Sequence, residues 1–154
     1  MRKLLIILFL ILIMPFGISS AKENDGNFSQ IFKLDVASLK YEQKQLVYSI
    51  ITGNESAVKT ILDSDPNPNT TYARIPLTMF AIHANEIGIL KMLIEDYKFD
   101  PNEKVMGVTP LEISIYLKRY DAIKYLLSIG VVPSEEVLQY IKKSKNKKLK
   151  ELFE

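Results

Sequence analysis

The stretch that decides the fold is GVTPLEISIYLKRYDAIKYLLSIG, residues 107–130. Its first part predicts a helix start, with Thr109 as the N-cap, Pro110 in the first helical position and Glu112 closing a capping box. Apolar residues then recur through the same segment; they are Leu111, Ile113, Ile115 and Leu117. We therefore expect a short helix that begins directly after Thr109.

A second short helix is expected from about Asp121, because Ile123, Leu126 and Leu127 share one helical face. Gly130 follows it and suits the left-handed residue that ends such a helix. Neither helix is long enough to be stable alone, so helix pairs from neighbouring units must stack on one another.

Two earlier segments align with this stretch and indicate an internal repeat. Lysines stand at the same place in each segment, at positions 59, 91 and 124, so the steps are 32 and 33 residues. The polar residues that close the segments are Asn69, Asn102 and Ser134, and their steps are 33 and 32 residues. Two independent markers therefore give one period, and each period predicts one pair of helices.

The repeated units resemble the ankyrin repeat over about residues 41–154. The third unit matches best, through Thr109-Pro110-Leu111 at its start and Gly130 at its end. This resemblance implies an all-α fold, a solenoid of stacked helix-turn-helix pairs with about three repeats and a C-terminal cap.

The other two units depart from the ankyrin pattern. The second has Ile75-Pro76-Leu77 in place of Thr-Pro-Leu and contains two extra residues, one between Leu77 and Lys91 and one within residues 95–100. The first lacks Thr-Pro-Leu altogether but keeps Gly53-Asn54 and Ile61-Leu62, as an N-terminal capping unit can.

The C-terminal end has the pattern of a terminal cap. Ser134 is expected to start a helix, and Asn146 a last short one with Leu149, Leu152 and Phe153 facing inward. Six lysines surround these positions; they are Lys142, Lys143, Lys145, Lys147, Lys148 and Lys150. We interpret this basic end as a solvated cap rather than as a contact for an anionic membrane or nucleic acid.

The N-terminus is interpreted as a secretory signal peptide over residues 1–21. A positive start precedes a short apolar stretch, and Ser19-Ser20-Ala21 offers a peptidase site. The alternative is an uncleaved anchor that extends to Ile18. Residues 22–40 are then expected to be a partly disordered N-terminal segment, and residues 41–154 the ankyrin-repeat domain.

The composition excludes several kinds of chemical site. The 154 residues include no cysteine and one histidine, which excludes disulfides, thiolate sites and any site that needs two imidazoles. Without Arg2 and Lys3 the mature chain has 18 basic and 18 acidic residues, hence no net charge. Export without disulfides favours a bacterial periplasm or extracellular location.

Nothing in the sequence indicates an enzyme, a cofactor or a metal site. Residues 63–74 begin like a calcium loop, but Pro68 and Arg74 replace the glycine and the bidentate glutamate that such a loop needs. His83 has no nucleophile or oxyanion motif beside it. A small exported hydrolase or metal-dependent enzyme on this scaffold, and a membrane-tethered adaptor, remain the alternative classes.

The resemblance implies that loop tips and the exposed side of the first helices bind another protein. The candidate protein-binding residues are Tyr72, Arg74 and His83 in the second unit, and Val105, Met106, Val108, Tyr116 and Leu117 in the third. Burial of Val108 and Leu117 by the next repeat is the competing interpretation, and the extra residue leaves the register of His83 open by one position.

Together these expectations describe an exported, monomeric, non-enzymatic protein-binding module. Its partner is expected to be another protein, with no nucleic acid and no membrane involved in the mature form. Sequestering, protecting or inhibiting an exported protein is the role that fold-level analogy suggests.

Overall fold

The computed structural model describes residues 40–65, 71–72 and 75–154, which all lie in the second of two units, residues 1–35 and 36–154. The expected signal peptide and the segment 22–39 lie outside the described residues. The helices are α3 (Tyr41–Ile51), α4 (Glu55–Asp63), α5 (Leu77–Ala84), α6 (Ile87–Glu95), α7 (Pro110–Tyr116), α8 (Tyr120–Ser128), α9 (Glu135–Lys143) and α10 (Lys147–Lys150). The strands among the described residues are two residues long, β1 (Thr71–Tyr72) and β2 (Ile75–Pro76). Because almost all regular structure is helical, the all-α prediction is confirmed.

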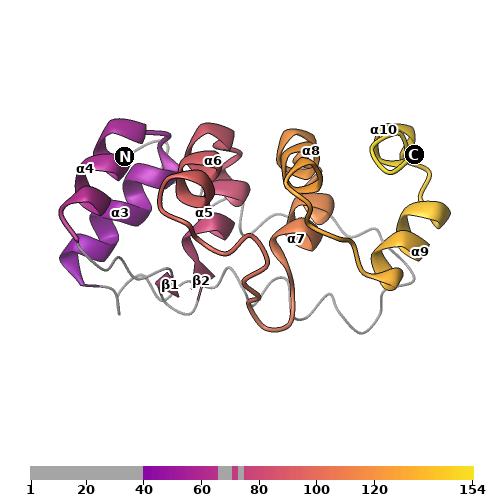
Figure 1. The fold of residues 1–154 in the computed structure, drawn as a ribbon, viewed down its shortest axis with the longest axis horizontal. Coiled ribbons are helices and arrows are strands. Elements are labelled where there is room, and N and C mark those ends of the chain that lie inside the picture. Colours follow the sequence, from indigo (N-terminus) through magenta and orange to yellow (C-terminus); the bar gives the residue numbers. More distant parts are fainter. Residues whose placement is uncertain (1–39, 66–70, 73–74) are drawn as a thin grey trace, which may run out of the picture. The chain divides into compact units, whose positions relative to one another are not determined.

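The helices pack as consecutive pairs in two layers. In the first three pairs, α3 packs on α4, α5 on α6 and α7 on α8. Of the first helices, α5 contacts both α3 and α7 in one layer, and the second helices α4, α6 and α8 lie in the other (Figure 1). The hairpin β1–β2 precedes α5, and an isolated bridge between Val105 and Val108 precedes α7.

The start of α7 follows from its sequence as predicted. The Glu112 backbone N–H donates to Thr109 Oγ1 at 3.2 Å, and the Thr109 N–H donates to Glu112 Oε2 at 2.8 Å. Pro110 occupies the first helical position, where its missing N–H leaves no bond unmade. The capping box is therefore confirmed.

A left-handed turn recurs between the two helices of each repeat and fixes the register of the array. It is formed by Gly53 (φ 71°), Asn85 (φ 64°) and Lys118 (φ 56°), which are 32 and 33 residues apart. The residue after each turn donates its N–H to a buried small residue of the preceding helix, namely Ser49, Ala81 or Ser114. Ser49, Ala81 and Ser114 are all buried, so the same small, buried position recurs in each of the three repeats.

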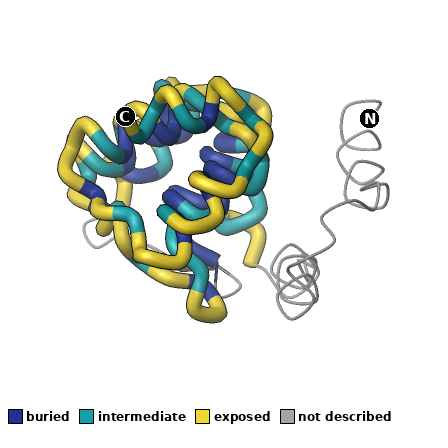
Figure 2. Tube along the Cα trace, turned by 90° about the vertical axis from the view of Figure 1, so that its right-hand side faces the viewer, coloured by how far each residue is buried: buried dark blue, intermediate teal, exposed yellow. Residues whose placement is uncertain are grey.

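The core follows the same period. Val58, Leu90 and Ile123 occupy equivalent places in α4, α6 and α8, and each has no exposed surface. Figure 2 shows buried positions recurring along the helices between exposed ones. Leu126 is likewise fully buried and Gly130 is left-handed with φ 89°, as the sequence predicted.

The two extra residues of the second repeat lie at helix ends. The first lengthens α5 to eight residues, against seven in α7. The second widens the turn after α6, where Tyr97 N–H donates to the carbonyl of Met92 five residues back. Beyond that turn, the Phe99 N–H donates to the carbonyl of Leu93. The Val131 N–H makes the equivalent bond to the carbonyl of Leu126 in the third repeat, so the two repeats are again in register.

The predicted terminal helices are also present. The Ser134 hydroxyl accepts the Val137 N–H at 3.3 Å, and Asn146 Oδ1 accepts the Leu149 N–H at 3.1 Å. Leu149 is buried, while Leu152 and Phe153 are half-buried. The last pair therefore continues the stack with its apolar side chains turned inward.

Candidate protein-binding surface

The hairpin before α7 carries three of the candidate residues. Val105 and Val108 exchange backbone hydrogen bonds of 3.0 and 2.9 Å, with Met106 and Gly107 between them at φ 50° and 84°. Met106 is 53% exposed and Val108 is half-buried. Val105 is only 5% exposed, so the expectation that it is presented to solvent is wrong: its side chain belongs to the core beneath the turn.

The hairpin before α5 holds the second group of candidates. Tyr72 lies in β1 and pairs with Ile75, while Thr71 pairs with Pro76. Arg74 lies outside the described residues. Ile75 is 3% exposed and stands two residues before α5, so this hairpin, like the next one, has a buried apolar residue that anchors it.

His83, Tyr116 and Leu117 lie at the other end of the first helices. Counted from the left-handed residues, His83 is equivalent to Tyr116, which resolves the register that the sequence left open. His83 and Tyr116 are half-buried, and Leu117 is the half-buried C-cap residue of α7. Leu117 is therefore neither fully exposed nor fully covered by the next repeat.

The candidates within the described residues do not form one cluster. The hairpins precede the N-terminal ends of α5 and α7, whereas His83 and Tyr116 lie at the C-terminal ends. A seven-residue helix such as α7 is about 10 Å long, since the rise is about 1.5 Å per residue. A partner that contacts both groups must therefore span the length of the first helices.

Arg119 joins this surface, although no sequence motif marks it. Its Nη2 donates to the carbonyl of His83 at 2.7 Å and so caps the C-terminal end of α5 from the following repeat. Burial lowers the pKa of His83 below its ordinary value, and the nearby charge of Arg119 lowers it further. His83 is consequently favoured in its neutral form at this junction.

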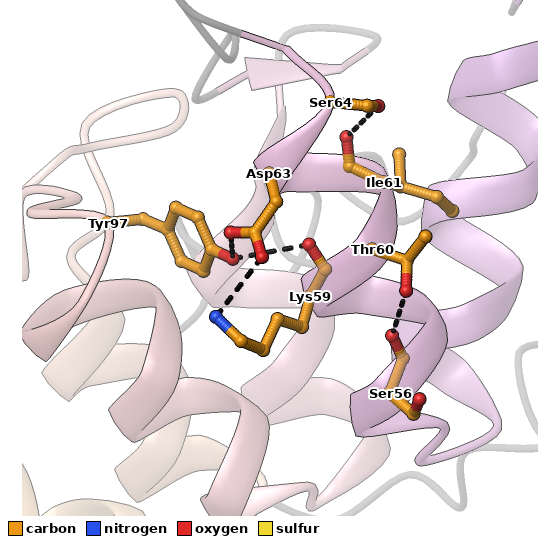
Figure 3. A network of polar contacts seen from close by, with 7 residues as sticks. All are labelled: Ser56, Lys59, Thr60, Ile61, Asp63, Ser64 and Tyr97. Carbon is orange, nitrogen blue, oxygen red and sulfur yellow. Dashed lines mark hydrogen bonds and ion pairs between the residues drawn. The ribbon is translucent and has the colours of Figure 1, made fainter.

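A polar network links the layer of the second helices α4, α6 and α8, here called the outer helices, through α4 and the turn after α6 (Figure 3). Tyr97 Oη donates to Asp63 Oδ1 at 2.5 Å and approaches the carbonyl oxygen of Lys59 at 3.3 Å, while Lys59 Nζ lies 3.2 Å from Asp63 Oδ2. Burial first, and then the Asp63 carboxylate, raise the pKa of Tyr97 to about 12. The Tyr97 hydrogen bond, followed by Lys59, lowers the pKa of Asp63.

A related contact links the next pair of outer helices. Lys91 Nζ lies 5.4 Å from the centroid of the Tyr125 ring, and burial followed by the Glu95 carboxylate raises the pKa of Tyr125 to about 12. Lys91 and Glu95 repeat the spacing of Lys59 and Asp63. In both cases a tyrosine from one repeat lies against a lysine and an acid of the preceding repeat, so these residues link adjacent repeats.

The described part of the chain also bears on metal, ligand and membrane binding. No group of three or more histidine, aspartate or glutamate side chains there could hold a metal ion. A hollow lined by Ala81, Ile82 and Leu90 has about 170 Å³ of empty space, part of it open solvent, which is smaller than the roughly 300–1,000 Å³ of ordinary ligand pockets. The helices of the described residues are all too short or too polar to cross a membrane.

Stacked helix pairs joined by left-handed turns, with hairpins between successive pairs, define a repeat solenoid. The family model of ankyrin repeats in three copies matches residues 39–136, and the chain belongs to this family. The comparison with curated proteins found no match. Ankyrin repeats are protein–protein interaction modules and are typically non-enzymatic.

Proposed function

We propose that this protein is exported, loses residues 1–21, and binds another exported protein so as to sequester, protect or inhibit it. Membership of the ankyrin family supports a protein partner in general. The observation that supports a particular binding surface is the exposure of Met106, a large apolar side chain that is 53% exposed at a hairpin tip. Exposed apolar anchors are what protein interfaces bury.

The half-buried residues at the other end of the first helices complete this surface. Tyrosine is enriched among residues that dominate binding energies, because it combines broad contact area with a polar group. Tyr116 has this character and lies on α7, the same helix that follows the Met106 hairpin. The proposed interface therefore extends along α7 from Met106 to Tyr116.

The experiment captures a partner with the immobilised mature chain, residues 22–154, from the exported fraction of the native source. The affinity is then measured for the purified partner. We expect Tyr116→Ala to weaken binding by about 2 kcal/mol or more, roughly 30-fold. Each variant must first be shown to be folded by circular dichroism and unfolding, because Tyr116 is half-buried.

A charge variant at the far end of the chain is the matched control. Lys142 and Lys147 are exposed, and replacing both with serine should change mainly the salt dependence and the association rate. If that variant lost binding while Tyr116→Ala kept it, the α7 surface would be rejected and the basic end would become the site.

Export has its own test. The intact mass of the protein recovered outside the cytoplasm should correspond to a chain that begins at Lys22. Ala21→Arg should block cleavage, because a small residue is needed at that position. Recovery of the unaltered full-length chain in the membrane fraction would instead establish the tethered adaptor.

A further inference from the structure

The turn that carries Met106 is a two-residue hairpin of the mirror-image type. Both central residues have positive φ, 50° at Met106 and 84° at Gly107, and Val105 and Val108 close the turn with two backbone hydrogen bonds. Because buried Val105 anchors the turn in the core, Met106 is held outside the packed helices.

Methionine is a poor residue for this position. Turns of this type favour asparagine, aspartate or glycine first, since other side chains are strained at positive φ. Gly107 supplies the usual second residue, and a Cβ placed there would have no neighbour within 4 Å, so the tip lies open. The chain therefore has an apolar side chain at a position where a polar residue would stabilise the turn and the surface.

The other methionines of residues 22–154 lie in different environments. Met79 in α5 has no exposed surface, and Met92 in α6 is half-buried. The rate of oxidation depends on how far an oxidant can reach the sulfur. Met106 is the most exposed of the three methionines and should therefore react fastest.

We propose that Met106 is a site of oxidation by peroxides, and that its conversion to the sulfoxide releases the bound partner. The Sδ lone pair attacks one oxygen of hydrogen peroxide, the O–O bond breaks, and the oxygen is transferred to sulfur. Sulfur loses two electrons and the peroxide, which gains them, leaves as water after proton transfer. An apolar side chain thereby becomes a polar one.

The consequence for binding rests on the proposed function. An apolar side chain at an interface strengthens binding because its transfer out of water is favourable. A sulfoxide oxygen that is buried without a hydrogen-bond donor makes this transfer less favourable and so weakens binding. The stack itself should tolerate the change, because the Met106 side chain lies outside the core. Oxidation is therefore expected to act on binding and not on folding.

The first experiment needs no partner. The mature chain is treated briefly with hydrogen peroxide, and sulfoxide is located by peptide mass mapping. We expect Met106 to oxidise about tenfold faster than Met79 in the folded protein, and all three methionines to oxidise at similar rates in urea. Equal or faster oxidation of Met79 or Met92 in the folded protein would overturn the site.

The second experiment measures the affinity for the captured partner before and after selective oxidation. We expect a loss of about tenfold or more, an unchanged unfolding midpoint, and no response to peroxide in Met106→Leu, which keeps an apolar side chain. Met106→Asn should bind weakly while unfolding at higher denaturant, because asparagine suits the turn.

The outcomes separate the two proposals. Unchanged affinity after oxidation of Met106, or equal sensitivity of Met106→Leu, would overturn the switch and leave the binding function standing. A lowered unfolding midpoint of the oxidised protein would also overturn it, since the effect would then be structural. Failure of the unoxidised chain to bind any exported protein would overturn the proposed function and the switch together.

Discussion

Repeat 3 (residues 105–131) and repeat 2 (residues 75–99) contain the same two helices but begin the first one differently. α7 starts with the reciprocal hydrogen bonds of Thr109 and Glu112. α5 starts after Pro76, which offers no side-chain cap. Counted from Leu77, the residue equivalent to Glu112 is Thr78, whose hydroxyl is buried with no partner among the described residues. The start of α7 is thus capped by side chains of its own repeat, whereas the start of α5 has no side-chain cap.

The second helices of the two repeats also end differently. α8 ends at Ser128 and is followed by the left-handed Gly130, whereas the wider turn after α6 places Lys98 at φ 58°. That turn carries Tyr97 across to Asp63 of the first repeat. An inserted residue is thus accommodated where helices end, and a side chain of the widened turn links neighbouring repeats.

The largest effect is expected from the buried leucines that the two repeats share. Leu126 and Leu93 are equivalent by their backbone hydrogen bonds, and neither is exposed. Leu126→Ala and Leu93→Ala should each lower the free energy of unfolding by about 2–5 kcal/mol through the cavity that forms. Urea unfolding measures this. A loss under about 1 kcal/mol at either site would contradict the equivalence.

Much of the fold could be predicted from the sequence, because its signals are local. Thr109-Pro110-Leu111-Glu112 determines a helix start by short-range hydrogen bonds, and the 32- and 33-residue steps indicate the stack. These signals act within one repeat, so they can be recognised without knowing the neighbours.

The surface was harder to predict, because exposure depends on contacts between repeats. Val105 and Met106 are adjacent and both apolar, yet the mirror-image turn buries one and exposes the other. Arg119 acts through a carbonyl 36 residues earlier, and no motif marks such a contact. A tyrosine in a loop, such as Tyr97, likewise gives no indication that it meets Asp63.

The next largest effect concerns the helix start that only repeat 3 possesses. Thr109→Ala removes the acceptor for the Glu112 N–H and should lower the free energy of unfolding by about 1 kcal/mol. Thr109→Ser keeps a capping hydroxyl and should restore most of that loss. If the serine variant were as unstable as the alanine variant, the threonine methyl group and not the cap would be responsible.

A smaller effect of opposite sign is expected at the equivalent helix start in repeat 2. Thr78→Val replaces a hydroxyl that has no partner among the described residues with a methyl group of similar size. The free energy of unfolding should stay unchanged or rise by up to about 1 kcal/mol, since an unsatisfied buried polar group is removed. A marked loss of stability in the urea transition would show that the Thr78 hydroxyl is hydrogen-bonded, and that the start of α5 is satisfied as the start of α7 is.

The smallest effect distinguishes the two tyrosine contacts between the outer helices. Asp63→Asn should lower the pKa of Tyr97 from about 12 towards its ordinary value of 10.0, but only part of the way, because burial is the larger cause. The ring carbon that bears the hydroxyl, followed by carbon-13 NMR against pH, reports this pKa. Tyr125 is the internal control: its raised pKa comes from burial and Glu95, so it should not move.

The same shift has a consequence for stability at high pH. The pKa of Tyr97 is higher in the folded than in the unfolded chain, so its contribution is present below pH 10 and is lost as the pH rises towards about 12. Asp63→Asn should therefore flatten the decline of the free energy of unfolding across that interval, because part of the difference between the two pKa values is gone. An unchanged slope, together with an unchanged Tyr97 pKa, would show that burial alone sets the value and that the contact with repeat 1 adds nothing to it.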